Sequence, residues 1–333
     1  MSPATLVAWL GALQSQDYPM ALWSIAQRLS LTLAAVEAAV VDGSILRTHV
    51  LRPTWHFVPR DDLRWMQELT SPRVLALMRY QDRRNGLDAA LVTRGVKTIA
   101  RAIERRGHLT RREIGTALSG ARIPTTPWLV GHFLMHAEMR AIVCSGVPRG
   151  AQQTFALVDE RAPRPSALTR DEALAELTRR YFQSHGPATA KDYQWWSGLK
   201  AADASRGIAM LGRRVECVRS GGRVYVMGAD RAARRAARGP AHLVQPFDEI
   251  VVAYSESRDV VDAAGVAPAA GGLLLRAVIL DGLLVAQWKI TSTRGARAIV
   301  IDPLRPLSPA ERAAVAKAAA RFERGYLASR RSS

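Results

Sequence analysis

Three polar residues near the start of the chain could take part in chemistry: Gln14, Gln16 and Asp17. A glutamine side chain is neutral but carries hydrogen-bond donors and an acceptor, so a pair of glutamines could orient a water molecule. The pattern Gln-x-Gln is common, however, and the same residues could simply end a helix or lie at an interface. Asp17 could act as a carboxylate, but its position before Pro19 favours a role as a helix N-cap.

Two histidines, His132 and His136, are four residues apart on a predicted helix, a spacing that can bind Zn²⁺. No third ligand is evident in the sequence, and there is no His-Glu-x-x-His motif. The two cysteines, Cys144 and Cys217, form no Cys-x-x-Cys pair, which fits a reducing cytoplasm. We therefore expect no metal, and we expect both histidines to face the core or DNA. No phosphate-binding loop or dinucleotide fingerprint is present, so no organic cofactor is implied.

The charge balance favours a polyanionic partner. The sequence has 47 Lys and Arg against 29 Asp and Glu, a net charge of +18 over 333 residues. Such a balance suits nucleic acid or an anionic membrane, although an arginine-rich genome could contribute to it. The apolar stretch at Leu6–Leu13 is too short and lacks the basic flank of a signal peptide, and no segment predicts a membrane span. We expect a cytoplasmic, nucleoid-associated protein.

Basic and polar residues gather in three places where we predict contacts to DNA phosphates or grooves. Any one of these side chains could instead be solvated, and the polar hairpin could pack against the next unit. The residues of the predicted interface are Arg47, His49, Arg52, Thr54 and His56 in a hairpin, Arg111 and Arg112 on a helix, and Arg231, Arg234, Arg235 and Arg238 at helical spacing.

A pattern of helices followed by a β-hairpin occurs three times along the chain. In the first copy Thr32 can cap a helix, and extended arms follow at Ile45–His49 and Thr54–Val58. Capping boxes, in which an N-cap side chain and the residue three positions later bond each other's backbone, are predicted to open helices in the second copy at Thr110 and in the third at Thr169. A helix followed by a hairpin is typical of a winged helix, so we predict tandem winged-helix units.

The sequence changes character after Asp230. Several β-like runs follow, with Asp281-Gly282 as a tight hairpin turn between two of them. A further capping box at Ser308 opens a closing helix to about Leu327. The predicted fold class is α+β: three tandem winged-helix units, a small C-terminal β-barrel and a closing helix. The predicted domains are 1–90 with the Gln-x-Gln motif, 91–165, 166–239, and 240–333. The β-like runs are His242–Val244, Ile250–Tyr254, Leu273–Leu280, Leu283–Ile290 and Ala298–Ile301.

Several short stretches of the chain resemble the winged-helix DNA-binding family that contains the bacterial glycosylases AlkZ and YcaQ. Each matching stretch is short, but together they run in the family's order from Leu13 to Leu327. The family's Met-Arg-Gly-Thr segment reads Leu51-Arg-Pro-Thr54 here. The stretches are Leu13-Gln-Ser-Gln-Asp17, Ala21-Leu-Trp-Ser24, Arg47–Pro59, Gly186-Pro-Ala-Thr189, Trp195-Trp-Ser-Gly198, Gln245-Pro-Phe-Asp248 and Ala286-Gln-Trp288.

The resemblance implies a C-shaped clamp on duplex DNA, and catalysis by the two polar residues of the motif, here Gln14 and Gln16. The motif lies close to the start of the chain, so we expect that an element common in relatives is missing ahead of it or that the true start lies upstream. An N7-alkylated purine already carries positive charge, so its release needs little acid catalysis. It needs a placed water and dipoles that stabilise an oxocarbenium-like state.

We therefore predict a DNA glycosylase that hydrolyses the N-glycosidic bond of bulky or cross-linked N7-alkylpurines. The alternative is a non-catalytic DNA binder that acts as a regulator or damage sensor. We expect a monomer that binds double-stranded, damaged DNA without a metal, an organic cofactor or a membrane.

Overall fold

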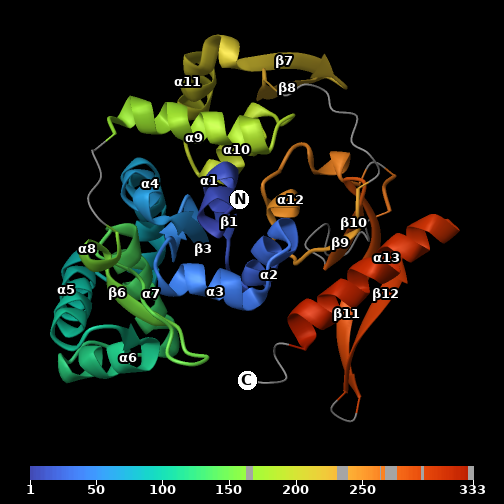
Figure 1. The fold of residues 1–333 in the computed structure, drawn as a ribbon. Helices are drawn as coiled ribbons and strands as arrows, with labels where there is room; N and C mark the ends of the chain where they lie inside the picture. The colour runs from blue at the N-terminus through green and yellow to red at the C-terminus, as the bar shows by residue number, and fades with distance from the viewer. Residues whose placement is uncertain (163–167, 231–238, 263, 267–275, 294–295, 329–333) are drawn as a thin grey trace.

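The computed structural model describes residues 1–162, 168–230, 239–262, 264–266, 276–293 and 296–328 (Figure 1). The first group of elements lies at the centre of the molecule. Its short strand β1 joins the later hairpin as an edge, in the order β1-β3-β2. The elements are α1 (Pro3–Leu10), β1 (Leu13–Gln14), α2 (Tyr18–Leu29), α3 (Leu33–Val41), β2 (Ile45–Val50) and β3 (Arg52–Pro59).

The same order of elements recurs in the second group. A 22-residue helix, α4 (Leu63–Arg84), follows a short 3-10 turn at Arg60–Asp62 and leads into it. The three strands pair in the order β4-β6-β5, matching the first group. The elements are α5 (Ala89–Arg106), β4 (Leu109–Thr110), α6 (Arg111–Gly120), α7 (Pro127–Met139), β5 (Val143–Ser145), β6 (Thr154–Leu157) and α8 (Val158–Arg161).

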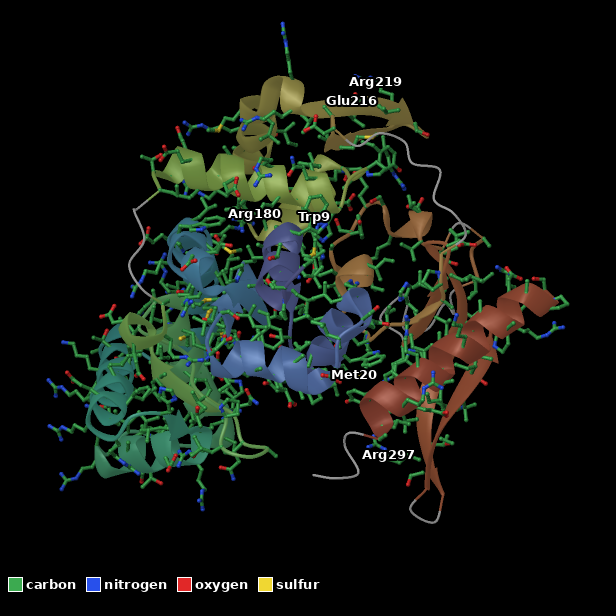
Figure 2. The ribbon with its side chains drawn as sticks, viewed as in Figure 1. Trp9, Met20, Arg180, Glu216, Arg219 and Arg297 are labelled. Carbon is green, nitrogen blue, oxygen red and sulfur yellow. The ribbon has the colours of Figure 1, made fainter. Side chains whose placement is uncertain are left out.

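The third group has the order again, with a single bridge between Ala188 and Val226 in place of the short strand. It packs on the 3-10 turn that follows the first group through Arg180 of α9, labelled in Figure 2, which donates to Asp62 at 3.1 Å. The elements are α9 (Arg170–Ser184), α10 (Ala190–Ser197), α11 (Ala201–Leu211), a 3-10 turn (Gly212–Arg214), β7 (Val215–Ser220) and β8 (Arg223–Gly228).

The C-terminal part differs from the prediction. Its described strands form an open antiparallel sheet in the order β12-β11-β10-β9, so the predicted barrel is wrong for this part of the chain. The edge strand β9 has only two residues, and α13 covers the sheet, with Phe322 and Trp288 rings 4.8 Å apart. The elements are β9 (His242–Leu243), α12 (Glu249–Val252), a 3-10 turn (Arg258–Val260), β10 (Ala277–Leu280), β11 (Leu283–Thr293), β12 (Ala296–Pro303), α13 (Pro309–Phe322) and a final π-turn (Glu323–Leu327).

The predicted strand at Ile250–Tyr254 is also wrong, because Glu249–Val252 is the helix α12. Asp248 caps this helix by accepting a hydrogen bond from the backbone of Ile250, and its carboxylate is paired with Arg28 at 2.6 Å. A buried apolar run of four residues does not by itself distinguish a strand from a helix. Here the ion pair between Arg28 and Asp248 holds the capping residue in place, and the segment begins as a helix.

The cores show how the groups share their apolar surfaces. The second group has a core of its own, built from residues between Leu87 and Phe155. One core joins residues of the first group to the C-terminal sheet and α13, and another joins the first group to the third. These shared cores do not show which segments fold on their own, so the predicted domains 1–90, 91–165, 166–239 and 240–333 stay predictions.

No single helix in the described ranges has the length and apolarity of a membrane span. Within these ranges, α2 and α3 are long and apolar enough only when they are taken together, and the two helices are bent by 114° relative to each other.

Candidate active site and DNA interface

A cavity of about 880 Å³ opens where the first, second and third groups meet α12. Its wall is largely apolar, with basic side chains around it. The motif residue Gln14 lines it at a buried position, with 5% of its surface exposed. The lining includes the apolar Leu51, Pro53, Val74, Leu77, Met78, Met135, Trp195, Phe247 and Val252, and the basic Arg52, Arg73, Lys191 and Arg258.

Two charged residues fix Gln14 in place. Its backbone N–H donates to Glu249 Oε1 at 2.7 Å, and its side-chain oxygen accepts from Arg52 Nη2 at 3.2 Å. In the sheet, Gln14 of β1 lies opposite His56 of β3. The side chain is thus held by elements that are far apart in the sequence. Its carbonyl oxygen has two lone pairs, so it can still accept a hydrogen bond from water.

Glu249 is the residue that the sequence did not point to. It is 2% exposed, accepts from Trp196 Nε1 at 3.0 Å, and lies 3.7 Å from His185. Burial acts to raise its pKa, but the contacts to His185 and Arg52 outweigh burial and lower the pKa, so the carboxylate is charged. The signal available in the sequence is its place directly after the Gln245-Pro-Phe-Asp248 stretch.

Gln16 has a different environment. It is exposed, does not line the cavity, and its side-chain oxygen accepts from the backbone of Trp55 at 3.4 Å. The carboxylate of Asp17 accepts from the backbone of Met20 at 3.3 Å and caps α2, as the sequence predicts. The two glutamines therefore both bond to the β3 hairpin arm or its turn, one buried and one on the surface.

Arg52 and Trp195 form a cationic and aromatic edge to the cavity. Trp195 is 49% exposed, and the guanidinium groups of Arg52 and Arg258 lie 5.8 and 5.7 Å from the centroid of its ring. Its indole N–H donates to the carbonyl of Val252 at 3.1 Å, which fixes the ring. An exposed, fixed ring flanked by cations is suited to stacking with a flat aromatic group.

The histidines of the hairpin, for which the sequence predicts contacts to DNA, are buried in this structure. His56 is 0% exposed and its Nδ1 donates to the carbonyl of Thr54 at 2.9 Å. Burial, with the charge of Arg52, lowers its pKa to about 3, so the ring is neutral. His49 is 4% exposed and is paired with the buried Glu138. Both side chains serve the packing of the hairpin, while Thr54 lines the cavity.

Arg47 and the arginines Arg111 and Arg112 line a second, smaller cavity of about 370 Å³. Arg47 donates to the carbonyl of Ser15 at 3.1 Å and lies 4.3 Å from the Trp55 ring. Burial lowers its pKa to about 10, so it remains cationic at neutral pH. Arg111 and Arg112 are exposed. The predicted cluster Arg231, Arg234, Arg235 and Arg238 lies outside the described residues.

The structure supplies the third ligand-type residue that the sequence did not reveal beside His132 and His136. Asp82 of α4 contacts Nε2 of both rings, and all three residues are buried. The sequence shows no third ligand beside this pair, and the structure places a carboxylate there. The reason is tertiary: α4 packs along α7 and brings Asp82 to a pair that lies 50 and 54 residues later in the chain.

Comparison with known proteins identifies the family of this chain. The description "DNA glycosylase AlkZ-like" matches residues 7–324, almost the whole chain. The chain belongs to the AlkZ-like DNA glycosylase family. The fold agrees: the solved Streptomyces sahachiroi DNA glycosylase AlkZ superposes with a TM-score of 0.80 over 98% of this chain and 91% of that one. The two are 22% identical, so this likeness establishes the fold alone. No curated protein gives a significant match.

Family membership makes DNA the substrate class and N-glycosylic hydrolysis the class of reaction. The resemblance stated from the sequence is thereby confirmed. The assignment of individual residues is a separate matter, because a family description identifies no site in this chain.

Proposed function

We propose that this protein hydrolyses the N-glycosidic bond of bulky or cross-linked N7-alkylpurines in duplex DNA, with Gln14 and Gln16 as catalytic residues. The observation that carries the proposal is the position of Gln14: a buried amide that lines the large cavity and is held by Arg52 and Glu249. The repeated order of helix, short strand, two helices and hairpin supports three winged-helix units as the DNA-binding scaffold.

The fixed amide of Gln14 suits the chemistry of a cationic leaving group. Because the alkylated base departs neutral, the protein has no leaving-group charge to neutralise. The side-chain oxygen of Gln14 can accept a hydrogen bond from the attacking water through its second lone pair, which orients the water toward the sugar; the proton that the water loses on attack passes to solvent. The charged Glu249 behind it adds negative potential where the sugar develops positive charge.

The cavity wall supports a bulky adduct. A volume of about 880 Å³ lies within the range of sites that bury drug-sized ligands, and its apolar residues favour an aromatic or alkyl substituent. Trp195 offers a ring face, and the four basic residues Arg52, Arg73, Lys191 and Arg258 suit the phosphates of the same strand.

The experiment is base release under single-turnover conditions. Purified protein in excess is mixed with duplexes carrying either a small N7-methylguanine or a bulky N7 adduct, and abasic sites are measured after mild alkali. We expect release from the bulky adduct, at a higher rate than from the methylated base. DNA binding in a gel shift without any base release would overturn the enzymatic proposal and leave a non-catalytic binder. Release of the methylated base alone would overturn the bulky-adduct preference.

A further inference from the structure

Three buried side chains with metal-binding atoms meet between α4 and α7. They are Asp82 from the last turn of α4, and His132 and His136 from one face of α7. Their ligand atoms all lie within 4.8 Å of one another, and the residues are 6%, 4% and 3% exposed. Two imidazoles and one carboxylate are a recurrent ligand set for Zn²⁺ and related divalent metals.

The Nε2 atoms of His132 and His136 both face the carboxylate of Asp82. Nε2 of His136 is 3.3 Å from the Asp82 carboxylate, and Nε2 of His132 is in direct contact with it. The spacing of four residues stacks the two histidines on successive turns, which is the arrangement that lets one helix give two ligands. Trp128 stacks on His132 at 4.7 Å and fixes its ring plane.

The second ring nitrogen of His136 takes no part in this arrangement. His136 Nδ1 is buried and has no hydrogen-bond partner within the described structure. A polar atom buried in this way costs free energy, and such atoms in folded proteins call for a specific explanation. The ligand atoms of the cluster are the two Nε2 atoms, which both converge on the single carboxylate of Asp82.

Room for a fourth ligand exists on one side of the cluster. Asp82 and His136 line a cavity of about 670 Å³ whose wall also contains Arg79, Arg83 and Arg140. Two neutral imidazoles and one carboxylate would leave a divalent ion with net positive charge. The neighbouring arginines therefore favour an anionic fourth ligand, such as hydroxide or chloride.

We propose that Asp82, His132 and His136 form a Zn²⁺ site that ties α4 to α7. The neighbouring residues on both helices indicate a structural role for this site. Met78, one turn before Asp82, and Met135, directly before His136, both line the large cavity. A metal at this crossing holds the α4 wall of the active-site cavity against the second group of elements.

The test is metal binding by the full-length chain. Protein stripped with a chelator is titrated with Zn²⁺ by calorimetry, and separately with Co²⁺ while visible absorption is recorded. We expect one equivalent to bind, and the midpoint of thermal unfolding to rise by roughly 5 °C when free Zn²⁺ is about 100-fold above its dissociation constant. Asp82→Asn and the double variant His132→Gln with His136→Gln should lose both effects.

His108→Gln is the matched control, since His108 is paired with a single carboxylate, Glu160, at 2.8 Å and should keep full binding. X-ray absorption on the Zn²⁺-loaded wild-type protein gives an answer even if a variant fails to fold. It should show two imidazoles, oxygen ligands or a light anion, and no thiolate. Absence of binding to the wild-type chain overturns the site, and so does thiolate ligation or binding that persists in the double variant.

Discussion

The guanidinium of Arg52 donates a hydrogen bond from Nη2 to the side-chain oxygen of Gln14 at 3.2 Å. The same guanidinium donates from Nη1 to the carbonyl of Val252, at 3.3 Å, and lies near the Trp195 ring. Arg52 thus connects the motif glutamine to α12 and to the exposed aromatic edge of the cavity. It fixes which face of the Gln14 amide is turned to the cavity.

Arg52→Ala should lower the single-turnover rate of base release about 10-fold at saturating protein, because Gln14 is then free to rotate. In a double-mutant cycle, Arg52→Ala should have little further effect once Gln14 is alanine, since the two side chains act as one unit. Rates from the four proteins on the same duplex measure this. Additive losses would show that Arg52 acts on DNA independently of Gln14.

Gln14→Ala should reduce base release by about 10²-fold or more while leaving DNA affinity nearly unchanged. The same outcome is expected for Gln16→Ala, although Gln16 is exposed and outside the cavity wall. Neutral glutamines contribute little to phosphate attraction, so rate and affinity should separate. Gln183→Ala, a glutamine that does not line the cavity, is the control. If binding and thermal stability fall together with the rate, the glutamines are structural.

Duplex binding should weaken steeply with salt, with little sequence preference. Each phosphate contact contributes roughly −0.9 to the slope of log K against log salt. Replacing the exposed Arg111 and Arg112 by Gln should reduce the slope by about 1 to 2. Charge reversal along Arg231, Arg234, Arg235 and Arg238 should flatten the slope further, because it changes four side chains. Fluorescence anisotropy of labelled duplex over a series of salt concentrations measures this slope. A wild-type slope near zero would exclude an electrostatic interface.

Acid should destabilise the fold through His56. The pKa of His56 falls from 6.5 to about 3 on folding, chiefly by burial. Between these values the unfolded chain binds a proton that the folded chain does not, so the free energy of unfolding decreases as the pH falls, by up to about 1.4 kcal/mol per pH unit. His56→Gln should flatten this dependence in urea unfolding between roughly pH 6.5 and pH 5. An unchanged slope in His56→Gln would refute the assignment.

Gly198 should be intolerant of any side chain. It has a φ of +67°, and a Cβ there would lie 2.0 Å from the carbonyl oxygen of Leu51 in the β2–β3 turn. Gly198→Ala should therefore cost more than about 3 kcal/mol of the free energy of unfolding, from left-handed strain and the backbone clash together. Gly222→Ala has similar strain, at φ +76°, but nothing within 4 Å, and should cost only about 1 kcal/mol. Equal losses in denaturant unfolding would contradict the clash.

Local structure was largely predictable from sequence, because caps and turns depend on residues a few positions apart. The capping boxes at Thr110, Thr169 and Ser308 form as the sequence indicates. Asp281 and Gly282 both adopt positive φ in the predicted hairpin turn. The Gln-x-Gln motif could be located as well, and the match to the family could be made from short stretches alone.

What only the tertiary structure decided is which distant residues meet these local elements. Glu249 reaches the backbone of Gln14 across 235 positions, and Asp82 reaches His132 across 50. The burial of His49 and His56 depends on neighbours such as Glu138 that the hairpin does not itself contain. Helix capping follows from local backbone chemistry, whereas these contacts follow from the way whole apolar faces pack, and a spacing pattern does not encode which face meets which.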